Sequence, residues 1–283
     1  MMVTNPTVDL IAQCAEIPSF TTYEERLIPF IEQIASGVPG AKSTRVVENN
    51  IVIKVPGNPA KPTIAITAHL DKINHFGLDW AEKLPVSVTA EKIIGQLDDS
   101  VGVGLCLSLL QQTSRGDFPT MLFLFSEMEE GNGLKYHPEW LRGGGKGVHS
   151  GLGAERISEY LLQNNLVPDQ VITIDTTPLF KGEPGLAIYT DHWEKNGLTP
   201  PPDLISATET VYQRFMEIDP ELLKYNNTND YLAYGLKLNQ DPTHPITSIA
   251  LEPAIFPYHQ PGEEVFQGDI VRLEKCLVGY LGK

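Results

Sequence analysis

The chain of 283 residues has few cysteines, few basic residues and no long apolar run. Its cysteines, Cys14, Cys106 and Cys276, are too few and too scattered for a disulfide framework or a paired-cysteine metal site. They are typical of buried thiols in a reducing compartment. Lys and Arg total 21 against 36 Asp and Glu, so the net charge is −15 at pH 7. This balance argues against binding to nucleic acid or to an anionic membrane, because both require a basic face.

No stretch approaches the roughly 18 consecutive apolar residues of a transmembrane helix. The N-terminal sequence MMVTNPTVDL lacks the basic region and the apolar run of a signal peptide. We therefore expect a cytoplasmic protein. With 41% hydrophobic and 20% charged residues, the composition is that of a globular chain that can bury a sizeable core.

Apolar strands alternate with helices along the chain. Nearly continuous apolar runs predict strands at 63–68, 120–126, 170–174, 185–190 and 246–251, each covered on both faces. A strand or hairpin is expected over 45–57, with its turn at Asn49–Asn50. Helices are predicted at 22–37, where Thr22 and Glu25 form a capping box, and at 101–110, 155–164, 203–217, 230–238 and 269–281. This order predicts a single α/β domain over residues 1–283, a three-layer sandwich around a mixed, mostly parallel sheet.

Histidines and carboxylates follow the carboxyl ends of several of these strands. In open α/β sheets the ligand crevice lies beyond those ends, so we expect these side chains to converge. Asp98 and Asp99 come just before the helix at 101–110, which adds a fifth segment. The groups at the strand ends are His69 and Asp71, then Glu127, Glu129 and Glu130, then Asp175, and finally His259.

Two histidines with three or four carboxylates suit a pair of divalent ions, zinc above all. Two such ions held by a bridging carboxylate lower the pKa of a bound water and polarise a carbonyl. A general base must lie beside that water without binding metal, and the neighbours Glu129 and Glu130 point in different directions. One of them can bind metal while the other reaches the water. Asp71 is placed to accept the second ring N–H of His69 and to orient the ring.

Five segments resemble the metal-site motifs of the co-catalytic zinc exopeptidase clan: TAHLD (67–71), LDDSVG (97–102), EMEEGNG (127–133), TIDTT (173–177) and YHQPGE (258–263). The clan includes bacterial leucyl aminopeptidases, glutamyl and tetrahedral aminopeptidases, and acetylornithine-deacetylase-type enzymes. The resemblance implies a zinc-exopeptidase fold and two zinc ions, with Co²⁺ or Mn²⁺ as alternatives.

The resemblance also implies a role for each matched residue. Asp98 would bridge the two ions, and its peptide bond to Asp99 is often cis in this clan. Glu129 would be the general base and Asp71 the orienting residue. His69 and Asp175 would hold one ion, and Glu130 and His259 the other.

Spacing narrows the choice within the clan. Only 27 positions separate Asp71 from Asp98, which leaves no room for the domain that tetrahedral and glutamyl aminopeptidases insert there. The 84 positions from Asp175 to His259 are too few for an inserted lid or dimerisation domain. The layout is closest to the leucyl aminopeptidase type, a catalytic domain alone.

The sequence favours an aminopeptidase that acts on peptides through a metal-activated water. An N-acyl amino acid deacylase or other amidohydrolase, a glutaminyl-cyclase-like enzyme with one zinc, and a non-catalytic binding protein on a hydrolase fold are the alternatives. No nucleophile elbow, P-loop or dinucleotide fingerprint is present. Glu127 and Asp230 are candidates to hold a substrate amine, while oligomeric state and the substrate pocket are not predicted. The remaining histidines, His75, His137, His149, His192 and His244, are expected to bind no metal.

Overall fold

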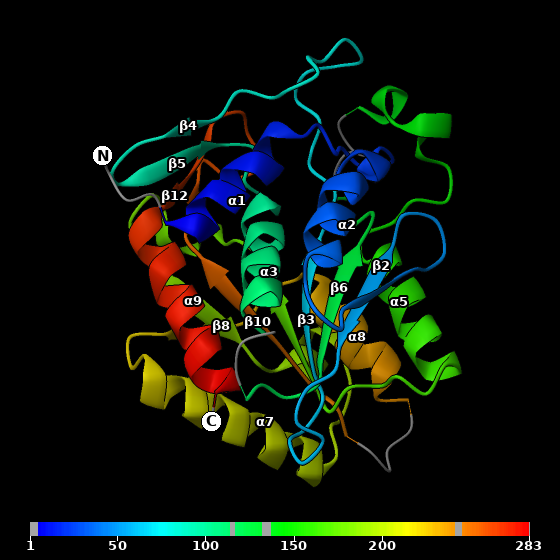
Figure 1. Cartoon of the computed structure of the whole chain (residues 1–283), viewed down its shortest axis with the longest axis vertical. Helices are drawn as coiled ribbons and strands as arrows, with labels where there is room; N and C mark the ends of the chain where they lie inside the picture. Colours follow the sequence, from blue (N-terminus) through cyan, green and yellow to red (C-terminus); the bar gives the residue numbers. More distant parts are fainter. Residues whose placement is uncertain (1–4, 114–116, 132–136, 241–244, 283) are drawn as a thin grey trace.

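An eight-stranded sheet forms the centre of the computed structural model, which describes residues 5–113, 117–131, 137–240 and 245–282 (Figure 1). The strand order is β1-β2-β6-β3-β7-β10-β8-β9. β3 pairs in parallel with both β6 and β7, and β10 pairs in parallel with β7, whereas β1, β2 and β8 pair with their inner neighbours in antiparallel fashion. The strands are β1 (Lys42–Arg45), β2 (Ile51–Val55), β3 (Ile64–His69), β6 (Met121–Ser126), β7 (Gln170–Ile174), β8 (Leu186–Tyr189), β9 (Leu223–Tyr225) and β10 (Thr247–Pro253).

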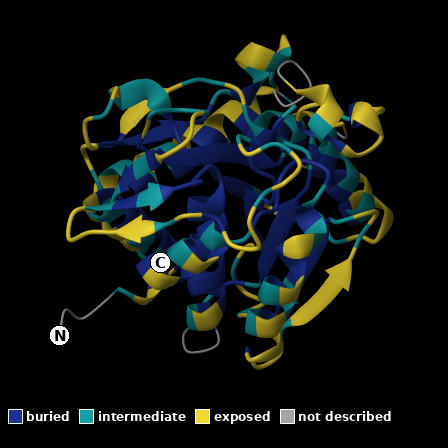
Figure 2. Cartoon of the chain, turned by 90° about the horizontal axis from the view of Figure 1, so that it is seen from above, coloured by how far each residue is buried: buried dark blue, intermediate teal, exposed yellow. Residues whose placement is uncertain are grey.

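Helices cover both faces of this sheet, because its central strands carry apolar side chains on both. Along β6, Phe123 and Phe125 join the larger core with helices α1, α2, α3, α7 and α9, whereas Leu122 and Leu124 join a second core with α5 and α8. Figure 2 shows the buried strands lying between these layers. The helices are α1 (Pro6–Glu16), α2 (Ile28–Ser36), α3 (Ser100–Thr113), α5 (Leu152–Gln163), α6 (His192–Asn196), α7 (Pro202–Ile218), α8 (Asp230–Leu238) and α9 (Gln267–Leu281). The predicted three-layer α/β sandwich is confirmed.

A second, antiparallel sheet of four short strands lies beside the central one, in the order β11-β12-β5-β4. It consists of β4 (Ser87–Val88), β5 (Lys92–Gly95), β11 (Ile255–Phe256) and β12 (Glu263–Phe266). The sequence analysis did not predict this sheet, because its strands are too short to show a clear period. It joins the segment that precedes Asp98 to the segment that follows β10.

The predicted elements of the central fold are present, with one correction. The helix expected over 22–37 is instead a 3₁₀ turn (Glu24–Arg26) followed by α2. Thr22 has a φ of +73°, so it cannot serve as the N-cap, and the capping box is wrong. Pro29 in the first turn of α2 marks the true start, because a proline there loses no hydrogen bond.

Three further expectations concern the first hairpin, the cysteines and membrane-spanning helices. The hairpin expected over 45–57 is present: Arg45, the last residue of β1, pairs with Ile51, the first residue of β2. All three cysteines are buried and free. Among the described residues, no helix has both the length and the apolar composition needed to cross a membrane.

Candidate metal centre

The predicted site residues converge at one edge of the central sheet. β3 lies between β6 and β7 and ends at His69. β6 ends just before the segment 127–130, and β7 ends just before Asp175. Asp98 leads into α3, and His259 lies between β11 and β12. Parallel strands place their carboxyl ends together, so the convergence follows from the topology.

Asp98 lies between the two histidines. Its Oδ1 is 3.2 Å from Nε2 of His69, and its Oδ2 is 3.3 Å from Nε2 of His259. The peptide bond between Asp98 and Asp99 is cis, as the resemblance implies. Each oxygen of one carboxylate therefore faces a different histidine, which is the arrangement required of a ligand that bridges two ions.

Glu130 and Asp175 extend this arrangement on either side. Oε1 of Glu130 is 3.3 Å from Nε2 of His259, and Oδ1 of Asp175 is 3.8 Å from Nε2 of His69. Two atoms bound to zinc at about 2.1 Å in a tetrahedral geometry lie about 3.4 Å apart. The observed separations are close to that value. These buried groups could hold metal ions.

Asp99 adds an oxygen that the sequence analysis did not assign. Its Oδ1 accepts the main-chain N–H of Gly102 at 2.7 Å, so Asp99 does cap α3 as a simple reading of the sequence suggests. Its Oδ2 is buried and has no hydrogen-bond partner among the described residues. Ligand atoms of Asp99, His69 and Asp175 lie within 4.8 Å of one another, so Asp99 also lies at the candidate metal centre.

Asp71 organises the segment that carries the two glutamates. Its Oδ1 accepts the main-chain N–H of Glu129 at 2.9 Å, and its Oδ2 accepts that of Glu130 at 3.0 Å. Thr21 Oγ1 donates to the same Oδ2 at 2.8 Å. Nδ1 of His69 is 2.9 Å from the main-chain oxygen of Asp71 and 3.4 Å from its carboxylate. The closer contact for the ring is therefore the carbonyl, while the carboxylate mainly holds the glutamate segment.

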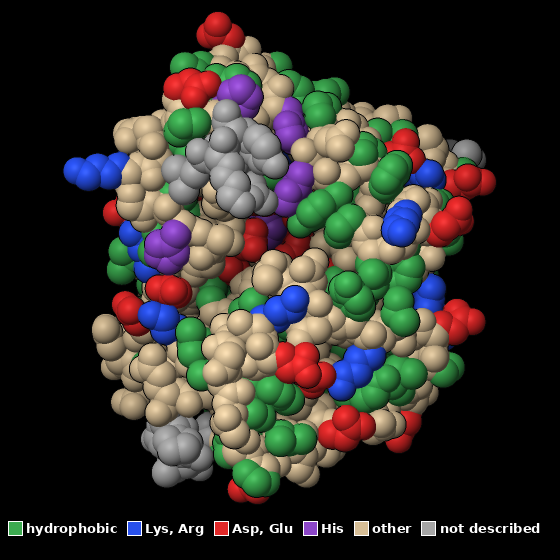
Figure 3. Space-filling model, turned by 180° about the vertical axis from the view of Figure 1, so that it is seen from behind, with side chains coloured by type: hydrophobic (Ala, Val, Ile, Leu, Met, Phe, Trp, Pro, Cys, Tyr) green, Lys and Arg blue, Asp and Glu red, His purple; other side chains and the backbone are tan. Residues whose placement is uncertain are grey.

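Glu129 faces a cavity of about 330 Å³ at the candidate metal centre. Glu130, Ser150, Tyr258 and His259 are among its other lining residues. Ser150 Oγ donates to the main-chain oxygen of Glu129 at 2.7 Å, which fixes the backbone of this residue. Figure 3 shows acidic and histidine side chains gathered at the floor of a hollow in the surface.

The pKa shifts in this cluster indicate a site that favours cations. Burial raises the pKa of Glu129 well above its usual range, and the charges of Glu130 and Asp175 raise it further. Burial and the charge of Asp98 raise the pKa of Glu130 to about 7. Burial opposes protonation of His259, but the adjacent Asp98 and Glu130 carboxylates outweigh it and raise its pKa to about 11. So many buried carboxylates repel one another, and divalent cations among them would relieve that repulsion.

Glu127, one of the two candidates to hold a substrate amine, is hydrogen-bonded within the protein. Its side chain is fully buried, and its carboxylate accepts hydrogen bonds from Asn49 N at 3.0 Å, from Asn50 Nδ2 at 2.7 Å and from Arg156 Nη1 at 2.5 Å. Asp230 is also buried, and its Oδ2 accepts from Ser126 Oγ at 2.5 Å. Neither carboxylate is exposed to receive a substrate.

None of His75, His137, His149 and His192 belongs to the clusters of His, Asp and Glu among the described residues that could hold a metal ion. His149 makes a contact of 3.1 Å with the main-chain oxygen of Ser150 and lies at the surface. His192 is buried against Gly235 of α8. His75 and His137 do not join the candidate ligands either, and His244 lies outside the described residues.

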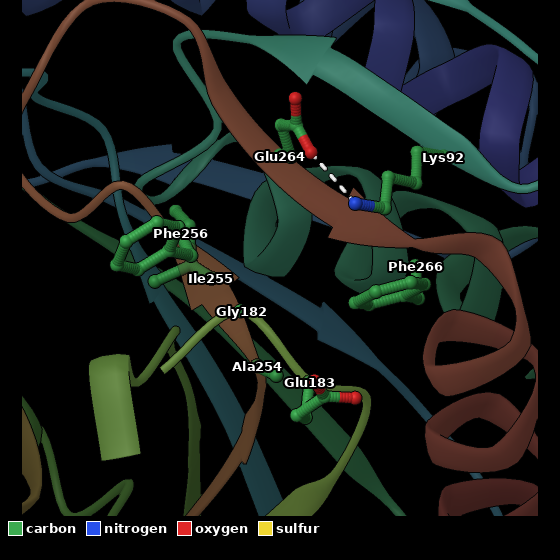
Figure 4. A pocket seen from close by; sticks show the side chains of 8 residues that line it. All are labelled: Lys92, Gly182, Glu183, Ala254, Ile255, Phe256, Glu264 and Phe266. Carbon is green, nitrogen blue, oxygen red and sulfur yellow. Dashed lines mark hydrogen bonds and ion pairs between the residues drawn. The ribbon is translucent and has the colours of Figure 1, made fainter. Parts of the chain in front are cut away.

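Another cavity lies between β12 and the segments 182–183 and 254–256 (Figure 4). Lys92 and Glu264 form an ion pair of 2.7 Å on one side of it, and Phe256 and Phe266 lie on the others. Its volume is only about 30 Å³. That is room for about one water molecule, so this cavity is no substrate site.

Comparisons with known proteins identify the fold through structure. A scan of the sequence against protein-family models gives no match. A search of curated proteins gives no match either. Many solved structures, however, share the fold over nearly the whole chain.

Three of these structures show the range of names found with this fold. A TET aminopeptidase from a marine sediment Thaumarchaeota archaeon is 12% identical, with a TM-score of 0.68 over 98% of this chain and 96% of that chain. An aminopeptidase from the archaeon Desulfurococcus kamchatkensis is 15% identical, with a TM-score of 0.67 over 98% of this chain and 94% of that chain. An endoglucanase from Thermotoga maritima is 12% identical, with a TM-score of 0.60 over 96% of each chain. The resemblance inferred from the five motifs is thus confirmed for the fold.

Proposed function

We propose that this protein is a dinuclear zinc aminopeptidase, which releases the N-terminal residue of a peptide. His69, Asp175 and Asp98 would hold one ion, and Asp98, Glu130 and His259 the other. The chain would act as a single catalytic domain in the cytoplasm, with Co²⁺ or Mn²⁺ as alternative metals. The observation that carries the proposal is the Asp98 carboxylate, whose two oxygens lie 3.2 and 3.3 Å from two different histidines.

The reaction would depend on Glu129. The bound ions would supply an acidified water and a polarised carbonyl. Glu129 lines the cavity and is not needed as a ligand, so it can take the proton of the attacking water and pass it to the leaving amine. Burial raises the pKa of Glu129 above its usual range, which favours its holding the proton between the two transfers. Asp71 keeps Glu129 in place through the main-chain hydrogen bond.

The cavity favours a peptide over an N-acyl amino acid. A peptide presents a cationic ammonium group, whereas an acylated amino acid presents only a carboxylate at its charged end. The described lining of the 330 Å³ cavity includes Glu129 and Glu130 and neither Lys nor Arg. Such a lining offers no basic side chain to pair with the carboxylate of an N-acyl amino acid.

Replacing Glu129 with Gln tests the assignment. We expect the E129Q variant to bind two metal ions per chain and to lose about 100-fold to 10,000-fold in kcat on dipeptides, the usual contribution of a general base. The E130Q variant serves as the matched comparison, because it removes a proposed ligand and should lower the metal content. Near-normal turnover by E129Q would contradict the proposed role of Glu129.

The endoglucanase of the same fold defines a second candidate function. Most glycoside hydrolases use two carboxyl groups that flank the scissile bond and need no metal-binding histidine cluster for that chemistry. Here the carboxylates are grouped around His69 and His259, which favours metal-assisted hydrolysis. A panel of dipeptides, N-acetyl amino acids and carboxymethyl cellulose separates the candidates, and we expect turnover of the dipeptides only.

A further inference from the structure

A second cavity, of about 250 Å³, lies at the small sheet. Its walls are mainly apolar, and its lining includes Phe76, Pro85, Val86, Ile94, Gln96 and Pro261. No charged side chain is among its described lining residues. It therefore differs in chemistry from the acidic cavity that Glu129 and Glu130 line.

The walls of this apolar cavity are held in place by the fold. Ser87 of β4, which also lines the cavity, is the cross-strand partner of Ile94 of β5. Asn74 Oδ1 accepts the main-chain N–H of Phe76 at 2.8 Å, and the ring of Phe76 packs 6.0 Å from that of Phe20. The cavity is thus a preformed feature of the surface.

The apolar cavity adjoins two segments that carry candidate metal ligands. Gln96, which lines the cavity, precedes the proposed bridging ligand Asp98 by two positions. Its Nε2 donates to the main-chain oxygen of Gln260, the neighbour of His259, at 3.5 Å. At about 3.3 Å per residue, Gln96 lies about 7 Å from Asp98. Pro261, another lining residue, follows His259 by two positions. The cavity is therefore within one or two peptide residues of the candidate metal centre.

The size and chemistry of the cavity define the group that would fill it. An apolar protein cavity of about 150 Å³ is large enough to bind benzene. A volume of about 250 Å³ therefore accepts the side chain of Phe, Leu or Met. A charged side chain would lose its hydration there without finding a partner.

We propose that the apolar cavity binds the side chain of the residue that follows the scissile bond, and that the enzyme prefers peptides with a large apolar residue at this second position. The proposal rests on the aminopeptidase function proposed above. The scissile carbonyl would lie beside the metal centre, and the side chain that follows the scissile bond would extend towards the apolar cavity.

Paired dipeptides test the preference. We expect Ala-Phe and Ala-Leu to have a kcat/KM about tenfold or more above that of Ala-Gly, since burying such a side chain gains about that factor. Ala-Asp should be the poorest substrate. Equal values for Ala-Phe and Ala-Gly would overturn the inference but leave the aminopeptidase function intact. A preference for Phe-Ala over Ala-Phe would also overturn it, whereas hydrolysis of no dipeptide would refute the function itself.

A variant that fills the apolar cavity tests whether this cavity is the source of the preference for a large apolar second residue. In Ser87→Trp the indole would occupy the cavity, and we expect the ratio of kcat/KM for Ala-Phe over Ala-Gly to fall close to one. Val88 is the matched control, because it is the next residue of β4, is 47% exposed and does not line the cavity. Val88→Trp should keep the wild-type ratio. A ratio unchanged in Ser87→Trp, with both variants folded by circular dichroism, would overturn the inference.

Discussion

Replacing Asp71 with Asn tests how the glutamate segment is held. Asp71 accepts the N–H groups of Glu129 and Glu130 and the hydroxyl of Thr21 at 2.8–3.0 Å. An Asn side chain has one acceptor oxygen. If that oxygen takes the place of Asp71 Oδ2, it still accepts from Thr21 and from the N–H of Glu130, but the NH₂ group then faces the N–H of Glu129. That leaves a buried donor unpaired and removes a hydrogen bond to a charged group, which costs about 2–4 kcal/mol of stability.

The effect on catalysis should exceed the effect on metal content. Moving a catalytic group by about 1 Å can cost about 100-fold in rate, so we expect kcat of D71N to fall by about that factor at saturating zinc. Thr21→Val is the control, because it removes one donor and leaves both glutamate contacts; it should cost about 1 kcal/mol and less than tenfold in kcat. Stability is measured by urea unfolding, kcat with dipeptides and metal content by elemental analysis. Wild-type kcat and stability in D71N would refute this account of Asp71.

Three other predictions follow from the described contacts. Zinc at about 100 times its Kd should stabilise the protein by about 2.7 kcal/mol and raise its melting temperature in calorimetry. EDTA should reverse this rise. A melting temperature that neither zinc nor EDTA changes would argue against a metal centre. Asp99→Asn keeps the cap on Gly102 but removes a carboxylate beside His69 that a zinc ion would keep ionised. Zinc affinity measured by chelator competition should therefore fall about tenfold, and an unchanged affinity would make Asp99 a cap alone. Burial lowers the pKa of His192 to about 4, so the unfolded chain binds a proton that the folded chain does not, and stability falls as pH drops from 6.5 towards 4. His192→Phe should remove about 2 kcal/mol of that loss at pH 5, measured by urea unfolding at pH 5 and pH 8.

The sequence predicted the central fold and the convergence of the site because both depend on local patterns. A strand such as β6 reads as an unbroken apolar run, since its two faces meet different helices, and the acids that follow it must lie at the strand end. The α2 start was missed because Thr22 and Glu25 match a capping box by type, whereas the positive φ of Thr22 depends on tertiary contacts.

The supporting residues of the site were missed for a similar reason. Glu263 belongs to the motif YHQPGE, but its role lies in accepting the main-chain N–H of Leu97 at 2.7 Å and of Asp98 at 3.2 Å. These hydrogen bonds join residues far apart in the chain. They depend on the small sheet, which no sequence pattern predicts. The position of Asp99 beside His69 and Asp175 was missed because it depends on the turn at Asp98, which no sequence pattern shows.

Part of the acidic composition is explained by carboxylates that accept main-chain hydrogen bonds around the site. Glu263 holds the backbone of Asp98, Asp71 holds that of Glu129, and Glu24 holds that of Met128 with a contact of 3.3 Å. Burial and the nearby carboxylates together raise the pKa of both Glu24 and Glu263 to about 8, so their charged forms are disfavoured in the protein alone. A divalent cation beside Asp98 would lower the pKa of Glu263 and strengthen its hold on the Asp98 backbone. The proposed ions and the supporting carboxylates would thus stabilise one another, which gives a reason for placing so many acids around one site.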